Sequence, residues 1–210
     1  MRYISFRYLY PPRPETAIAP DFLDWYEKRG WCAQYKKNGT NTIISIDPDK
    51  NFIAMNRHNA DHKAWDLTNH IKKELVRLFP EKHWFVLVAE IMHSKTKEIK
   101  DTIFIHDIIV YESELLYGSE FESRQQLLDK RLKTDRETDT HYICDLEGKV
   151  WFAKRFYKDF EKAFWAIKDP TVDEGLVLKN PKGKLSVCSK PTDNSNWQVK
   201  CRHSCKKYNF

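Results

Sequence analysis

Long apolar stretches are missing from this sequence. No run approaches the roughly 18 apolar residues that a membrane-spanning helix needs, so we expect no membrane partner. The first five residues, Met-Arg-Tyr-Ile-Ser, lack the apolar segment of a targeting peptide, so none is expected. Internal repeats and low-complexity linkers are also missing, so the 210 residues are expected to form one compact domain.

Cysteine is too scarce and too scattered for a disulfide framework. The five cysteines are odd in number and spread along the chain, which is typical of reduced thiols in a cytosol-like compartment. Cys201, His203 and Cys205 lie close together near the end of the sequence. A structural zinc site needs a second ligand pair at suitable spacing, and the sequence has none, so no zinc is expected there.

The composition is that of a well-packed globular protein. Hydrophobic residues make up 41%, aromatic residues 14% and charged residues 31% of the chain, and the mean hydropathy is −0.70. This excludes a disordered protein. The 36 basic and 30 acidic residues leave a net charge of +6, which permits a polyanionic partner without requiring one.

Strand and helix patterns mix without the strict alternation of a doubly wound fold. Strands are expected at 31–37, 42–46, 51–57, 83–92, 102–111, 175–179, 185–189 and 197–202. Helices are expected at 21–28, 61–79, 120–134 and 156–167, with turns at 38–39 and 47–50. This arrangement favours an α+β fold of mostly antiparallel sheets flanked by helices.

A lysine at a strand end is the first candidate functional residue. Lys36 precedes the turn Asn38-Gly39, so its amine can be held rigidly at the mouth of a pocket. Neighbouring positive charge and desolvation would favour the neutral, nucleophilic form of such an amine. An ordinary surface lysine in a turn fits the same short motif, so the motif alone leaves both interpretations open.

Three further segments carry charged residues at strand ends or on strand faces. Glu90 follows a continuous apolar run, where an unpaired carboxylate is costly. Glu174 and Gly175 open a short apolar strand, and carboxylate oxygens suit Mg²⁺. Lys200 and Arg202 alternate along one face of a strand, as in a phosphate-binding clamp. Solvated strand ends and strand faces would explain each segment separately.

The order of these four segments resembles that of the covalent nucleotidyltransferase superfamily, which includes ATP-dependent DNA ligases, RNA ligases and mRNA capping enzymes. The resemblance runs from about residue 31 to residue 204. It is strongest to phage nick-sealing RNA ligases, because the lysine motif continues as Gly39-Thr40-Asn41 and the last motif reads Lys-Cys-Arg-His-Ser from Lys200 to Ser204. The resemblance implies a nucleotidyltransferase (ligase adenylation) domain.

The resemblance also implies a role for each matching residue. Lys36 would become the lysyl-AMP nucleophile, and Lys200 and Arg202 would contact the α-phosphate. Glu174 would help bind Mg²⁺ or Mn²⁺, and Glu90 would bind the ribose hydroxyl. The nucleotide-binding set is Lys36, Gly39, Arg57, Glu90, His106, Glu174, Lys200 and Arg202, with Arg57 at the nucleotide sugar or its phosphates and His106 stacked on adenine.

Three features depart from the family pattern. His106 stands where the family usually has phenylalanine or tyrosine, and Asn38 stands where it often has aspartate or histidine. Gln34 and Tyr35 replace a carboxylate that ligases often carry just before the lysine. These departures leave the choice of nucleotide and the adenine contact open.

We therefore expect an ATP-dependent RNA or polynucleotide ligase that joins 5′-phosphate and 3′-hydroxyl ends. It would be a monomer of one domain, residues 1–210, without a C-terminal OB-fold or helical domain. Its partner would be RNA, a nicked duplex or DNA, gripped by surface lysines such as Lys182, Lys184, Lys190, Lys206 and Lys207. Its location would be the cytoplasm, that of the host if a phage encodes it, with a role in nucleic-acid repair.

Four alternatives stay open at this point. A minimal ATP-dependent DNA ligase would use the same chemistry, and a capping-type enzyme would use GTP. A nucleic-acid-binding protein could keep the fold without catalysis. A structural or interaction domain could carry the motifs by chance.

Overall fold

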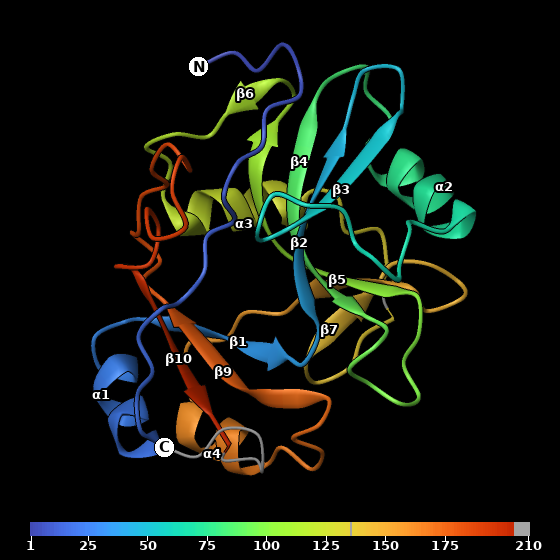
Figure 1. The fold of residues 1–210 in the computed structure, drawn as a ribbon. Coiled ribbons are helices and arrows are strands. Elements are labelled where there is room, and N and C mark those ends of the chain that lie inside the picture. Colours follow the sequence, from blue (N-terminus) through green and yellow to red (C-terminus); the bar gives the residue numbers. More distant parts are fainter. Residues whose placement is uncertain (135, 204–210) are drawn as a thin grey trace.

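Two β-sheets form the framework of the molecule (Figure 1). The computed structural model describes residues 1–134 and 136–203; Ser204, Cys205, Lys206 and Lys207 of the sequence-based predictions lie outside this part. The smaller sheet has the antiparallel order β1-β9-β10. Its strands are β1 (Cys32–Lys37), β9 (Asp173–Lys179) and β10 (Gln198–Arg202).

The larger sheet has the order β3-β2-β4-β5-β8-β7, and β6 pairs with β5 beside this path. Its first four strands in this order are β3 (Phe52–Asn56), β2 (Thr40–Ile46), β4 (Phe85–Met92) and β5 (Thr102–Tyr111). The others are β6 (Glu114–Leu115), β7 (His141–Ile143) and β8 (Val150–Ala153). Only the β5–β8 pair of this sheet is parallel, so the prediction of a mostly antiparallel α+β fold is confirmed.

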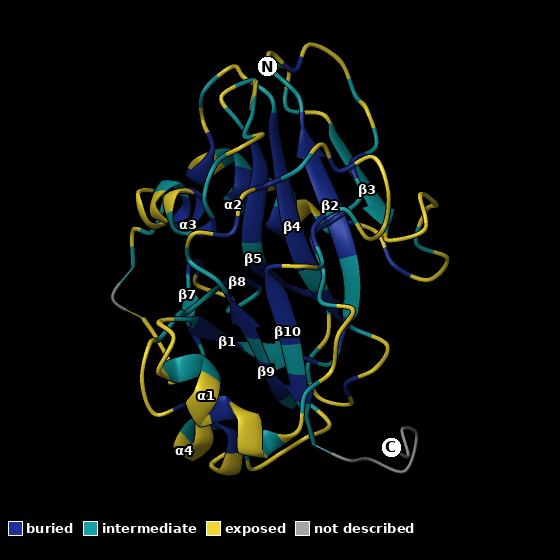
Figure 2. Cartoon of the chain, turned by 90° about the vertical axis from the view of Figure 1, so that its left-hand side faces the viewer, coloured by how far each residue is buried: buried dark blue, intermediate teal, exposed yellow. Residues whose placement is uncertain are grey.

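Short helices cover the outer faces of the sheets. They are α1 (Leu23–Glu27), α2 (Asn69–Leu78), α3 (Phe121–Asp129) and α4 (Phe160–Trp165), with a 3₁₀ turn at Pro20–Phe22. The strands are the most buried elements, and much of α1 and α4 is exposed (Figure 2). Leu23, Phe160 and Phe164 of these two helices pack on Leu176 and Leu178 of β9, so one face of the small sheet is closed.

The N-terminal segment connects the two sheets before the first helix begins. The Tyr3 amide donates to the Ser113 carbonyl near β6, and the Tyr10 amide donates to the Cys188 carbonyl. Further along, the segment runs beside β10 with a parallel bridge between Ala17 and Lys200. Figure 1 shows this dark-blue segment passing from the end of the large sheet to the small sheet.

The turn predicted at Asn38-Gly39 does not form a hairpin. β1 pairs with β9, and β2 pairs with β3 and β4, so the chain passes here from the small sheet to the large one. The Asn38 amide donates to the Val172 carbonyl, and its side chain donates to the Thr171 carbonyl. These bonds turn the chain away from β1, and the nucleophile candidate therefore lies at the junction of the sheets.

Three helices are shorter than their sequence patterns predict. The 61–79 helix begins only at Asn69, because Thr68 is extended and its hydroxyl accepts from the Ile71 amide. The 156–167 helix begins at Phe160, because Asp159 has φ 63°, a left-handed conformation that interrupts a helix. The 120–134 helix ends at Asp129, and beyond it Arg131 turns to form ion pairs with Glu81 and Glu112.

The strand predicted at 185–189 was wrong. Asp193 accepts hydrogen bonds from the Ser189 and Lys190 amides, and Cys188 has φ 57°, so this segment is a side-chain-closed loop. Strands β6, β7 and β8 were not predicted, because each spans only two to four residues and so offers little periodicity. Within residues 1–134 and 136–203, no helix has the length and apolarity needed to cross a membrane.

A buried ion pair joins β5 to α3. The Asp107 carboxylate accepts from Arg124 Nε at 2.9 Å and Nη2 at 3.0 Å, and both side chains are at most 1% exposed. The Asp107 carboxylate also accepts from the Ile108 amide, and Arg124 donates to the Ser119 carbonyl. This bidentate pair fixes α3 on the strand that carries His106.

Candidate nucleotide-binding site

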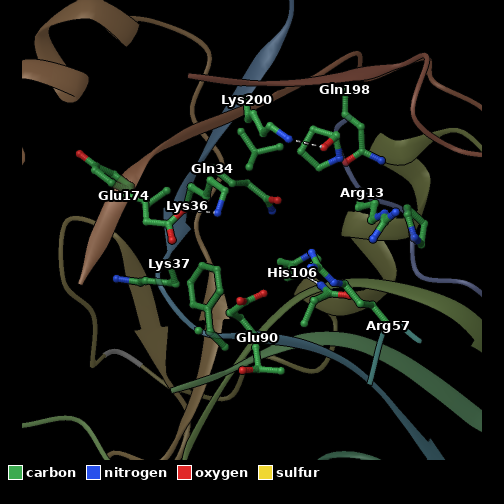
Figure 3. Close-up of a pocket in the computed structure, with 18 of the residues that line it drawn as sticks. Arg13, Gln34, Lys36, Lys37, Arg57, Glu90, His106, Glu174, Gln198 and Lys200 are labelled. Carbon is green, nitrogen blue, oxygen red and sulfur yellow. Dashed lines mark hydrogen bonds and ion pairs between the residues drawn. The ribbon is translucent and has the colours of Figure 1, made fainter. Parts of the chain in front are cut away.

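A cavity of about 410 Å³ lies between the two sheets. The sequence-predicted site residues all line it: Lys36, Gly39, Arg57, Glu90, His106, Glu174, Lys200 and Arg202. They come from five strands and from the segments that follow β1 and β3. Figure 3 shows most of them pointing into one space, which is large enough for a nucleotide-sized ligand.

Strand alternation in the small sheet explains why Lys36 faces this cavity. Gln34 and Lys36, two residues apart on β1, both line the cavity. Their neighbour Ala33 packs in the apolar cluster on the other face of the strand. Lys36 lies opposite Gly175 in the β1–β9 register, which shifts just after Lys36. Its ammonium forms an ion pair with the Glu174 carboxylate, so the predicted nucleophile and the predicted metal ligand are in direct contact.

Two glycines let backbones approach each other at the cavity wall. A Cβ on Gly175 would lie 2.0 Å from the Cys201 carbonyl oxygen, and the residue has φ +150°, which side chains rarely adopt. A Cβ on Gly39 would lie 2.5 Å from the Glu90 side chain. The absence of a side chain at Gly175 therefore allows β9 to lie close to β10. The absence of one at Gly39 allows the turn after Lys36 to pack against the Glu90 side chain.

Glu90 and His106 come from the large sheet and face the small one. Glu90 lies within β4 rather than at its end, and burial raises the pKa of its carboxyl despite the nearby Lys36 and Lys95 ammonium groups. Burial lowers the pKa of the His106 imidazole to about 3, helped by the charge of Lys179. His106 is therefore neutral at physiological pH, and its ring is available for stacking rather than for charge pairing.

Lys200 and Arg202 occupy the β10 side of the cavity, as their alternation predicts. Val199 and Cys201, between and beside them, pack in the apolar cluster below. Burial lowers the pKa of the Lys200 ammonium, and the charges of Arg202 and Lys36 lower it further. Lys200 Nζ donates to the Pro14 carbonyl at 3.2 Å. These cations form a positively charged wall across the sheet from Glu174.

Sequence reasoning missed three cations that line the cavity. Arg13 comes from the proline-rich N-terminal segment, Lys95 from the loop after β4, and Lys179 from the end of β9. Lys95 donates to the Gly39 carbonyl and so holds the turn after Lys36. Strand alternation places Val177 at the cavity and, two residues later, Lys179 as well, so the sequence pattern could have predicted Lys179. Arg13 and Lys95 lie in irregular segments, where no such pattern exists.

A second ion pair supports the Lys36–Glu174 contact. Lys37 Nζ lies 2.7 Å from Asp173 Oδ1, and the Lys37 side chain is 2% exposed. The same ammonium donates to the Thr140 hydroxyl at 3.0 Å. Burial lowers the pKa of Lys37, and Asp173 opposes this effect. Lys37, which follows Lys36, and Asp173, which precedes Glu174, are thus fixed to each other. This pairing restricts how far the Lys36 and Glu174 side chains can separate.

Lys179 is expected to make stability depend on pH in the alkaline range. Burial lowers the pKa of its ammonium to about 8, against about 10.4 in an unfolded chain. Between these values the unfolded chain binds a proton that the folded chain lacks, so stability rises with pH. Lys179→Met should stabilise the fold by up to about 3 kcal/mol below pH 8, and the gain should shrink towards pH 10. Urea unfolding at several pH values measures this.

Lys182→Met is the matched control for this measurement. Lys182 is exposed and lies three residues further along the chain, so its replacement should give a small difference that is constant with pH. A Lys179→Met stability gain that stayed constant between pH 7 and pH 10 would contradict the assignment of a depressed pKa.

The residues present fit a divalent cation held mainly by substrate. In the described part of the chain, no group of three or more histidine, cysteine, aspartate or glutamate side chains is placed to hold a metal ion by itself. Mg²⁺ is usually bound by one or two carboxylates together with substrate phosphates. Glu174, with Glu90 on the opposite sheet, supplies such carboxylates in this cavity.

Three of the five surface lysines that were expected to bind nucleic acid lie in the described part of the chain. Lys182, Lys184 and Lys190 are exposed, so they are accessible to a partner. Lys206 and Lys207 lie outside the described residues.

No protein-family model matches the sequence, and no curated protein matches it. Solved structures do. A mycobacterial DNA ligase D complexed with ATP and MES matches with a TM-score of 0.62 at 15% identity, over 91% of this chain and 60% of that one. The ligase domain of M. tuberculosis LigD matches with a TM-score of 0.60 at 15% identity, over 94% of this chain and 61% of that one.

A third solved structure, described as Pmar-Lig_PreS3, has a TM-score of 0.57 at 13% identity and covers 93% of this chain and 47% of that one. This chain therefore spans about three-fifths of the ligase D chains and about half of the third. At these identities the likeness concerns the fold, and it agrees with the resemblance read from the sequence. The chain has the fold of the nucleotidyltransferase domain of ATP-dependent ligases.

Proposed function

We propose that this protein is an ATP-dependent polynucleotide ligase that forms lysyl-AMP on Lys36. The observation that carries the proposal is the position of Lys36 in a nucleotide-sized cavity, paired with Glu174 and facing Lys200, Arg202 and Glu90. Nucleophile, carboxylates and cations converge there from strands distant in sequence. A chance set of surface residues would not converge in this way.

In the first step, Lys36 Nζ attacks the α-phosphorus of ATP. The N–P bond forms, the bond from the α-phosphorus to the bridging oxygen breaks, and pyrophosphate leaves. Lys36 attacks as the neutral amine: one ammonium proton passes to solvent before the attack and a second after the N–P bond forms, while the Glu174 carboxylate positions Nζ. Lys200 and Arg202 stabilise the charge on the phosphate oxygens during the transfer. Mg²⁺ or Mn²⁺ bound with Glu174 would neutralise further phosphate charge.

In the second step, an oxygen of the nucleic-acid 5′-phosphate attacks the same phosphorus. The N–P bond breaks, and the Lys36 nitrogen takes up two protons from solvent to become an ammonium again. In the third step, a 3′-hydroxyl oxygen attacks the 5′-phosphorus, and a phosphodiester bond forms. The bond between this phosphorus and the AMP phosphate breaks, so AMP leaves. The hydroxyl proton passes to solvent. Glu90 would accept a hydrogen bond from the ribose throughout, and Arg57 would bind the sugar or its phosphates.

The base would lie against His106. The imidazole is neutral, because burial lowers its pKa to about 3, so it can stack on adenine without the cost of burying a charge. Asn41 Nδ2 lies 3.4 Å from His106 Nε2, which orients the ring. The neighbouring Asp107–Arg124 pair fixes the strand behind it.

RNA is the favoured polynucleotide. This preference depends on the sequence resemblance, namely Gly39-Thr40-Asn41 after the lysine and the motif that begins at Lys200. One solved structure with the same fold is a mycobacterial DNA ligase D, so DNA is the alternative substrate. The substrate preference is decided by sealing assays on nicked duplexes that differ only in the sugar of the strand at the nick.

The test of the proposal is covalent labelling. The purified protein is incubated with Mg²⁺ and either α-labelled ATP or α-labelled GTP, denatured, and digested to locate the label. We expect label from ATP on the peptide that contains Lys36, released by added pyrophosphate. Label from GTP alone would point to capping-type chemistry. A folded protein that takes label from neither nucleotide would leave a nucleic-acid-binding protein.

A further inference from the structure

The N-terminal segment forms one wall of the nucleotide cavity. Pro12, Arg13 and Pro14 line it, although they precede the first predicted motif by about 20 residues of chain. The wall is held in place by backbone bonds to β10. The Lys200 amide donates to the Thr16 carbonyl at 3.0 Å, and the Ile18 amide donates to the Lys200 carbonyl at 2.9 Å.

This wall is also tied to a predicted catalytic side chain. Lys200 Nζ donates to the Pro14 carbonyl, one residue from Arg13. Pro12 and Pro14 restrict the backbone on both sides of Arg13, so the segment presents Arg13 from a stiff support. Anchoring to β10 and stiffening by proline give the Arg13 side chain a defined position at the cavity.

The recorded ion pair of Arg13 uses only one of the N–H groups of its guanidinium. Its Nε lies 2.7 Å from Glu15 Oε1, and its side chain is 26% exposed. Glu15 lies on the same segment and is itself 43% exposed at its side chain. A guanidinium carries five N–H donors in a planar fork, and among the described residues this ion pair is the one contact that the structure records for it. The remaining donors are free to bind an anion.

Arg13 lies across the cavity from the reacting lysine. In Figure 3, Arg13 and Arg57 lie on one side, and the Lys36–Glu174 pair lies on the other. Phosphoryl transfer places the attacking and leaving groups roughly in line. A leaving pyrophosphate must therefore point away from Lys36, towards the opposite side of the cavity. Arg13 and Arg57 lie on that opposite side.

We propose that Arg13 and Arg57 form a phosphate-binding site at this side of the cavity, with Arg13 contributed by the N-terminal segment. The inference rests on the proposed function. The geometry favours the pyrophosphate portion of ATP as the bound group. The 5′-phosphate of the nucleic acid has the same chemistry and could reach the same donors, so the experiment separates these two sources.

The first measurement is binding of inorganic tripolyphosphate by calorimetry, which requires no catalysis. Arg13→Ala should weaken binding about 10- to 100-fold, the usual effect of losing a hydrogen bond to a charged group. Arg13→Lys should recover part of the affinity, because a lysine keeps the charge without the planar fork. Arg7→Ala is the matched control, since Arg7 is an exposed arginine of the same segment that does not line the cavity.

Kinetics then identify the source of the phosphate. If Arg13 binds pyrophosphate, Arg13→Ala should raise the KM for ATP in adenylylation and the KM for pyrophosphate in its reversal by about the same factor. Transfer of AMP from pre-adenylated protein to a 5′-phosphate should stay unchanged. If Arg13 binds the 5′-phosphate, adenylylation and its reversal should be unaffected, and the transfer step should slow.

Two results would overturn the site. One is equal tripolyphosphate affinity for wild type and Arg13→Ala with all three steps unchanged. The other is an equal loss in Arg13→Ala and Arg7→Ala, which would indicate general charge rather than a site. A wild-type protein that binds tripolyphosphate through Arg13 but forms no adduct would refute the proposed function and keep this inference, so the two failures can be told apart.

Discussion

Lys36→Ala is expected to abolish covalent labelling by ATP, whereas the fold stays intact. The methyl group that replaces the side chain offers no nucleophile, and the other lysines of the cavity cannot substitute for it. Lys37 is held by Asp173, Lys95 is held by the Gly39 carbonyl, and Lys179 and Lys200 lie at the end of β9 and on β10. Intact-protein mass spectrometry after incubation with ATP and Mg²⁺ measures the loss, and circular dichroism checks the fold.

Two further variants make this result specific. Lys36→Arg keeps a cation beside Glu174 but provides no usable nucleophile, so it should also fail to form the adduct, with a thermal midpoint close to that of wild type. Lys73→Ala alters an exposed lysine of α2 that does not line the cavity, and it should label normally. Persistent labelling of Lys36→Ala at another lysine would move the nucleophile elsewhere.

Asp107→Ala is expected to lower the free energy of unfolding by about 3–5 kcal/mol. The change leaves the Arg124 guanidinium buried without its bidentate partner, and removing one member of a buried pair typically costs this much. Phe121 and Trp197 lie within 6 Å of that guanidinium but provide only weak cation–π stabilisation. Urea unfolding at neutral pH measures the difference.

The control for this prediction removes both charges. Asp107→Leu combined with Arg124→Met should be much less destabilised than Asp107→Ala, because no unpaired charge stays buried. Asp66→Ala, at an exposed aspartate, should change stability by less than about 0.5 kcal/mol. A cost below about 1 kcal/mol for Asp107→Ala would show that Arg124 finds other partners.

The same pair predicts an acid-side pH dependence. Burial raises the pKa of Asp107, but the neighbouring Arg124 outweighs burial and holds the pKa below its usual value. A carboxyl with a depressed pKa in the folded state stabilises the fold above the pKa of the unfolded chain, about 3.9. This contribution is lost as pH falls through the folded value. The gap between wild type and Asp107→Ala should therefore narrow below about pH 4.

The parts of the site that lie on strands were predictable from sequence. Side chains of a β-strand alternate between its two faces, so the sequence predicts that Lys200 and Arg202 share a face. The structure places both residues at the cavity. The same rule places Gln34 and Lys36 together. What the sequence could not show is that Asn38-Gly39 leads into another sheet. That outcome depends on Gly39 packing against Glu90, a contact between residues about 50 positions apart.

The parts that lie in irregular segments were not predictable. Arg13 sits in a proline-rich stretch without periodicity, so no local pattern indicates which way it points. The start of α2 was misplaced because Trp65 and Leu67 are buried from a loop, where apolar residues mimic the continuation of a helix. In both cases tertiary packing decides the outcome, and local propensity does not carry that information.

The order of strands in the small sheet has a consequence for how the chain folds during synthesis. Its strands come from residues 32–37, 173–179 and 198–202, and the N-terminal segment anchors to Lys200. The ribosome must therefore release almost the whole described chain before this sheet can form. The large sheet, most of whose pairings are closer in sequence, can assemble earlier. The cavity around Lys36 is therefore complete only after β10 (Gln198–Arg202) has been synthesised.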